Sequence, residues 1–217
     1  VSLLDEDGNA VARCDGDAGR MVVKNAHLWN VRNAYLYQLD IRTEDDHYTL
    51  PVGIRTIQVT ENQLLLNGSP VYLKGFGKHE DSDIKGRGLD NALNVRDFEL
   101  LKWIGANSFR TSHYPYSEEI MQMADRQGFL VIDEVPAVGM NFFSKSEVFA
   151  PGLADKKTLA HNKDVLTELY QRDKNHPCVI MWSVTNEPNS DNDSSLAYFT
   201  EVTAHIRNLD STRPVVG

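Results

Sequence analysis

The sequence predicts an α/β fold in which antiparallel strands come first and alternating strands and helices follow. Short segments of alternating apolar and polar residues, separated by turn sequences, occupy the first seventy positions. From about Tyr72, short apolar runs alternate with longer segments of helical periodicity. The chain has 217 residues, of which 41% are apolar, so it can bury a real core in one or two domains.

Three features predict the antiparallel part. Residues 1–4 and 11–13 are short apolar runs separated by the turn sequence DEDGN, which favours a hairpin. In residues 35–42, apolar and polar side chains alternate with the period of a half-buried strand. Residues 63–66 and 71–73 flank Asn67 and Gly68, a pair that accepts positive φ and favours a tight hairpin turn.

Repeated β-α units are expected in the remainder, with strands at 72–76, 106–109, 129–132 and 179–182 and the start of a fifth at 215–216. A helix from Ser117 to Gly128 has acidic residues in its first turn, and another runs from about Val165 towards Asp173. Two further helices are predicted from apolar stripes, which comprise Val95, Phe98, Leu101 and Ile104 in one and Leu196, Phe199, Val202, Ile206 and Leu209 in the other.

Such units give parallel strands joined by right-handed crossovers, either in an open doubly wound sheet or in part of an eight-stranded barrel. Residues 75–80 lack the glycine pattern of a dinucleotide loop, which argues against the open sheet. A barrel builds its site at the carboxyl ends of its strands. Polar residues gather there in this sequence, namely His79, Arg110, His113, Asp133, Glu134, Asn186 and Glu187.

Charge and composition argue against several functional classes. The net charge is −9, with no basic stripe, so nucleic acid is not an expected partner. Apolar runs are far shorter than the about 18 residues of a membrane helix, and no targeting leader is visible. Cys14 and Cys178 are expected to be free thiols. No metal is expected, because residues 79–81 match no metal-binding pattern.

Two long segments resemble the signatures of glycoside hydrolase family 2. Residues 107–115 (NSFRTSHYP), followed by Asp125 and Gly128, resemble the first signature, and residues 173–187 (DKNHPCVIMWSVTNE) resemble the second. Residues 75–81, 84–88 and 137–141 are more similar to the β-glucuronidases of this family than to its β-galactosidases. The similarity is to bacterial β-glucuronidases in particular.

The resemblance implies a partial architecture. Residues 1–60 correspond to part of an immunoglobulin-like β-sandwich, and residues 61–217 correspond to about the first half of a (β/α)8 TIM barrel. The glutamate that serves as nucleophile in the family belongs to a later strand and is absent from these residues. The sugar-carboxylate ligands of β-glucuronidases are absent as well, so this segment alone is expected to be inactive.

The resemblance also implies a reaction and its residues. Glu187 corresponds to the acid/base of a retaining hydrolase of β-D-glucuronides, and Asn186 corresponds to the ligand of the sugar 2-hydroxyl. Arg110 is expected to orient a catalytic carboxylate, and His79, His113 and Asp133 are the other candidates for substrate binding. The partner is a small glycoside, no cofactor is needed, and the parent enzyme is expected to be a homo-oligomer in the bacterial cytoplasm.

Several alternatives stay open at this stage. Arg110 could form a structural salt bridge in the barrel mouth, and Asp133 or Glu134 could hold Arg110 or His79 rather than meet substrate. The enzyme could be a β-galactosidase or another exo-glycosidase of family 2. The segment could also be a non-catalytic sugar-binding or structural module. Residues 141–163 are expected to border the site entrance.

Overall fold

A five-stranded parallel sheet forms the centre of the computed structural model, which describes residues 1–140 and 147–217. Its strand order is β12-β11-β10-β9-β8, and every neighbouring pair is parallel. The predicted order of adjacent parallel strands is therefore confirmed. In the described residues the sheet is open, with β12 and β8 at its edges. Its strands are β8 (Gly75–Lys78), β9 (Ser108–Thr111), β10 (Leu130–Glu134), β11 (Val179–Ser183) and β12 (Val215–Val216).

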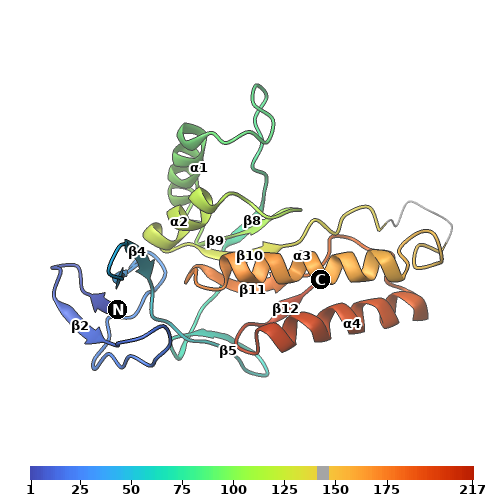
Figure 1. Cartoon of the computed structure of the whole chain (residues 1–217). Coiled ribbons are helices and arrows are strands. Elements are labelled where there is room, and N and C mark those ends of the chain that lie inside the picture. Colours follow the sequence, from blue (N-terminus) through green and yellow to red (C-terminus); the bar gives the residue numbers. More distant parts are fainter. Residues whose placement is uncertain (141–146) are drawn as a thin grey trace.

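One helix lies between each pair of successive strands, and α3 packs beside α4 along most of its length (Figure 1). The α1 helix begins after Asp90, whose side chain accepts from the Leu93 N–H, and α2 ends at Gly128 with φ 70°. Ser117 is at the N-cap of α2 as predicted, but its side chain makes no capping bond. The helices are α1 (Asn91–Trp103), α2 (Glu118–Gln127), α3 (Lys156–Asp173) and α4 (Asp193–Leu209).

The first seventy residues form two antiparallel sheets, as the alternation predicted. One has the order β2-β1-β3-β4, and its β1–β2 pair is the hairpin expected at the start of the chain. The other has the order β5-β6-β7, with Asn67 and Gly68 in the turn. Their strands are β1 (Ser2–Leu4), β2 (Ala10–Arg13), β3 (Tyr37–Arg42), β4 (His47–Val52), β5 (Ile57–Val59), β6 (Leu64–Leu66) and β7 (Ser69–Pro70).

Side chains from this antiparallel part bind the backbone of the parallel part. The Trp29 indole donates to the Asp125 carbonyl at 2.8 Å, and Arg55 Nε donates to the Pro177 carbonyl at 2.9 Å. Arg32 donates to the Ala106 carbonyl at 2.8 Å. Asp125 lies in the last turns of α2, and the other two carbonyls lie just before β11 and β9. The antiparallel part therefore rests against the ends at which the parallel strands begin, away from the carboxyl ends.

Some predicted details are wrong. The first barrel strand is Gly75–Lys78 rather than 72–76, and Tyr72 is exposed. The second hairpin strand is Ser69–Pro70 rather than 71–73. The apolar stripes are buried only in part, because Val95 (50%), Ile104 (57%) and Leu196 (67%) are exposed, whereas their partners Phe98, Leu101, Val202 and Ile206 are buried.

Other expectations are confirmed within the described residues. Both cysteines are free thiols, and Cys178 is buried while Cys14 is half-buried. Trp182 is buried in the core, as predicted. Among the residues that the structure describes, no helix has the length and apolar character needed to cross a membrane. The expected site entrance at 141–163, and Asn141 of the 137–141 segment, fall partly or wholly on residues 141–146, which lie outside the described ranges.

Candidate active site

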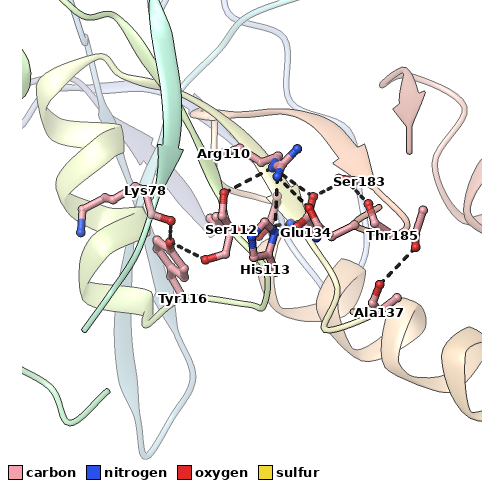
Figure 2. Close-up of polar contacts among 12 residues, drawn as sticks. Lys78, Arg110, Ser112, His113, Tyr116, Glu134, Ala137, Ser183 and Thr185 are labelled. Atoms are coloured by element: carbon pink, nitrogen blue, oxygen red, sulfur yellow. Dashed lines mark hydrogen bonds and ion pairs between the residues drawn. The ribbon is translucent and has the colours of Figure 1, made fainter. Parts of the chain in front are cut away.

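Glu134 lies at the centre of a polar cluster at the carboxyl ends of three parallel strands. It is the last residue of β10 and is fully buried. Its Oε1 is 3.1 Å from His113 Nδ1, and its Oε2 accepts a hydrogen bond of 2.6 Å from Ser183 Oγ. Arg110 Nε is 3.2 Å from Oε2 and completes an ion pair. Both oxygens of this carboxylate are thus held by side chains from β9, the segment after β9, and β11 (Figure 2).

The contact with Glu134 also favours one position for the hydrogen on the His113 ring. A carboxylate only accepts and a guanidinium only donates, so the shorter contact, with Glu134, favours hydrogen on Nδ1 over the tautomer in which Nδ1 accepts from Arg110. The Arg110 guanidinium lies 3.3 Å from the same nitrogen and is held as well by Ser112 Oγ, 3.3 Å from its Nε. In this tautomer, the hydrogen-bonding role of His113 towards any ligand falls on Nε2.

Arg110 connects the cluster to the loop after β11. Its terminal nitrogen donates to Asn186 Oδ1 at 3.1 Å, and the backbone N–H of Asn186 donates to the Ala137 carbonyl at 3.1 Å. Thr185 Oγ1 donates to the same carbonyl at 3.1 Å, which ties this loop to the segment after β10. The structure therefore brings Arg110 and Asn186 into direct contact at the carboxyl ends of β9 and β11.

Glu187 follows immediately and is exposed. Its φ is 45°, in the left-handed region that non-glycine residues rarely adopt. Backbone strain of this kind costs about 1–3 kcal/mol and persists where the surroundings fix the conformation. Here the fixed neighbours are Asn186, held at both its backbone and its side chain, and Thr185. The carboxyl group of Glu187 is thus presented to solvent beside the cluster.

His79 follows β8 and reaches the same cluster from the neighbouring strand. Its ring lies edge-on to His113, with 5.5 Å between centroids, and its side chain is 55% exposed. The next residue, Glu80, anchors this segment, because its N–H donates to the Tyr114 hydroxyl at 3.2 Å and its Oε1 accepts from the Ser117 N–H at 3.0 Å. The structure therefore brings His79 to the cluster with an accessible ring.

Asp133 does not join this cluster, although the sequence grouped it with the others. Its Oδ1 accepts from Thr111 Oγ1 at 3.2 Å, and the charged groups near it are Asp173 and Arg172 at the end of α3. Burial raises the pKa of Asp133 well above its ordinary value, and the nearby Asp173 raises it further. Because successive residues of a strand point to opposite faces, Asp133 points to the helices when Glu134 points to the site. The structure therefore does not bring Asp133 to the cluster that holds the other predicted site residues.

Sequence reasoning left Glu134 without an assigned role and missed Ser183. One open alternative was that Asp133 or Glu134 holds Arg110, and in the structure Glu134 does so. The period of two could have separated Asp133 from Glu134. Arg110 and Glu134 lie near the ends of neighbouring strands, and only one of two adjacent acids can face Arg110. The Ser183 contact carries no comparable signal in the sequence.

A second group, Asp125, His176 and Cys178, places three possible metal ligands within 4.8 Å of one another. These residues already bind one another. Asp125 Oδ2 lies 2.5 Å from His176 Nδ1, and its Oδ1 accepts from the Cys178 N–H at 3.0 Å. Burial raises the pKa of the Cys178 thiol. With both carboxylate oxygens engaged and the thiol kept neutral, the group functions as a hydrogen-bond network at the end of α2.

Comparison with known proteins gives a consistent result. The family described as "Glycosyl hydrolases family 2, TIM barrel domain" matches residues 57–216. A β-glucuronidase of Paenibacillus borealis is 53% identical over 99% of the chain and 37% of its own length, and that of Homo sapiens is 47% identical over 99% and 34%. The chain therefore spans about a third of the length of these relatives.

Solved structures agree with this result. A β-glucuronidase of an uncultured Clostridium sp. superposes with a TM-score of 0.95 at 64% identity, covering 100% of the chain and 37% of that protein. A Ruminococcus gnavus β-glucuronidase in complex with uronic isofagomine gives a TM-score of 0.92 at 48% identity, covering 100% and 38%. Three observations agree with one another: the matched family, the polar cluster at the carboxyl ends of parallel strands, and the two signature segments. The chain belongs to family 2 of the glycosyl hydrolases.

Proposed function

We propose that this chain supplies the acid/base half of the active site of a retaining β-glucuronidase, with Glu187 as the acid/base. The observation that carries the proposal is the continuous chain of contacts from Glu134 through Arg110 to Asn186, directly beside the exposed Glu187. Relatives at 47–53% identity are named β-glucuronidases, which supports a β-D-glucuronide as substrate.

In this mechanism, Glu187 donates a proton to the glycosidic oxygen as the bond to the anomeric carbon breaks. The nucleophile would come from a later strand of the family's barrel. Glu187 then acts as base for the water that attacks the glycosyl-enzyme. Hydrogen bonds to the 2-hydroxyl strengthen in the transition state, and Asn186 is the residue beside Glu187 that can donate one. His79 and His113 are proposed as ligands of other sugar hydroxyls, because their rings meet at the accessible edge of the cluster.

Arg110 has a narrower role here than the sequence suggested. Its guanidinium is occupied by Glu134 and Asn186, so we assign it to the support of the site. On the resemblance alone, residues 1–60 are proposed as part of an immunoglobulin-like sandwich and residues 61–217 as the start of the barrel. A homo-oligomer in the bacterial cytoplasm is proposed on the same basis.

A chimera tests the proposal. Residues 1–217 replace the matching segment of the Clostridium relative, which supplies the rest of the barrel. The chimera should hydrolyse 4-nitrophenyl β-D-glucuronide and release the β-anomer first, as followed by ¹H NMR, and should leave the β-D-galactoside intact. The isolated segment should show no turnover, because one carboxylate alone cannot complete the double displacement. A folded chimera without glucuronide turnover would refute the proposed function.

A further inference from the structure

Glu134 cannot itself be a ligand of the sugar. Its side chain is fully buried, and its two oxygens are engaged by His113 Nδ1, Ser183 Oγ and Arg110 Nε. A buried carboxylate with this many partners is kept in one orientation, and removing it would leave a guanidinium beside it without its counter-charge. Any effect of Glu134 on the reaction must therefore pass through the groups that it holds.

In the described contacts, two of these groups reach the loop of Glu187: Ser183 Oγ lies 3.4 Å from the Thr185 carbonyl, and the side chain of Asn186 is contacted by Arg110. Glu134 and Ser112 hold the Nε of Arg110, and a terminal nitrogen donates to Asn186 Oδ1 at 3.1 Å. A guanidinium only donates, so this contact assigns the oxygen of the Asn186 amide to the side of Arg110. The Nδ2 group, which carries two hydrogens, is then turned away from Arg110.

We propose that Glu134 is a positioning residue that acts through Arg110 to fix the amide of Asn186, so that Nδ2 donates to the oxygen of the sugar 2-hydroxyl. The inference rests on the proposed function. It adds a specific dependence, because the contribution of Glu134 to the rate should vanish when the sugar has no 2-hydroxyl. A residue that only stabilised the fold would affect all substrates alike.

The test uses the chimera with Glu134→Gln, Asn186→Ala and both together, on 4-nitrophenyl β-D-glucuronide and on its 2-deoxy analogue. Misplacing a contact of the transition state costs about 10²-fold. Glu134→Gln should lower kcat on the glucuronide by about that factor with a much smaller change in KM. On the 2-deoxy substrate the loss should shrink to a few-fold. Once Asn186 is alanine, adding Glu134→Gln should cost little.

Ser183→Ala is the second variant, because it removes the 2.6 Å donor from Glu134, together with a longer 3.4 Å contact to the Thr185 carbonyl, and keeps the charge pair with Arg110. Ser183→Ala should lower kcat on the glucuronide by about tenfold and affect the 2-deoxy substrate much less. It replaces Glu134→Gln in the test if that variant melts below the assay temperature. An unsubstituted chimera without turnover would instead refute the proposed function. Equal losses on both substrates, or additive losses in the double variant, would overturn the positioning role.

Discussion

Asp133 and Glu134 are adjacent in sequence and both are fully buried, yet they lie in opposite chemical surroundings. Glu134 faces the site and meets a guanidinium, an imidazole N–H and a hydroxyl. Asp133 faces the helices and meets one hydroxyl and a second carboxyl group, that of Asp173. The difference shows that burial alone does not decide what a carboxyl group does; the neighbours on each face of the sheet decide it.

The comparison separates two kinds of consequence. On the site face, the contacts of Glu134 lead to Asn186 and the loop of Glu187, so changes there should appear in the rate. On the helix face, the raised pKa of Asp133 affects the free energy of unfolding. Changes at Asp133 should therefore appear in the pH dependence of stability.

The largest effect is expected for Glu187→Gln in the chimera. The substitution keeps the size of the side chain and removes the transferable proton, which is typically worth about 10²- to 10⁴-fold. Aryl glucuronides with poor leaving groups should lose most of their kcat/KM, whereas activated ones should lose far less. Azide should partly restore the second step. Equal loss across a series of graded leaving-group pKa, without rescue, would show that Glu187 only positions substrate.

Glu134→Ala should destabilise the barrel by about 3 kcal/mol, because it leaves the Arg110 guanidinium beside an empty buried position. Urea unfolding of the chimera measures the loss. Glu134→Gln is the matched control and should cost less, since the amide still accepts one hydrogen bond. A loss for alanine below about 1 kcal/mol would mean that solvent replaces the carboxylate and that the site face is not a closed network.

Asp133→Asn should change the slope of stability against pH. The folded-state pKa of Asp133 is raised, so its contribution is fully present below the ordinary aspartate pKa. As the pH rises, the unfolded chain releases this proton and the folded chain keeps it, so stability falls until the folded group also ionises. Asparagine does not titrate, so the variant should lack this fall in stability with rising pH. Urea midpoints from about pH 4 to about pH 9 measure it, and parallel curves for variant and parent would contradict the assignment.

The smallest effect is expected at Asp210, whose pKa is lowered in the folded state, whereas that of Asp133 is raised. Burial raises the pKa of Asp210, but hydrogen bonds from Thr212, Arg213 and Trp182 outweigh burial and lower it to about 2. Its contribution is present above the ordinary aspartate pKa and is lost as the pH falls towards about 2. Asp210→Asn should therefore flatten only the acid limb of the stability curve. A change confined to the alkaline limb would contradict this prediction.

Much of the fold follows from local sequence. The turn at Asn67 and Gly68, the cap position of Ser117 and the stop at Gly128 are set by backbone preferences within a few residues, and each lies where it was predicted. The order of parallel strands follows from repeated β-α units, whose handedness is set by strand twist. The two signature segments identified the family without coordinates.

The helix stripes show where local reasoning stops. Successive residues in a helix are separated by about 100° around the axis. A residue three positions later therefore lies about 60° short of a full turn, and this offset accumulates at each repeat. Val95 and Ile104 are three steps apart and lie on opposite sides of α1, which is why Phe98 and Leu101 between them are buried and they are not. Leu196 lies outside the buried stripe of α4 for the same reason.

The sequence by itself determined that acidic residues end β10 beside an arginine at the end of β9, and that Glu187 follows β11. Only the tertiary structure decided that Glu134 binds Arg110, that Arg110 binds Asn186, and that Asp133 meets Asp173 from α3. The reason is physical. Strand period and turn chemistry act between near neighbours, whereas the partner of a buried carboxyl group is set by elements tens of residues away that pack against its face of the sheet.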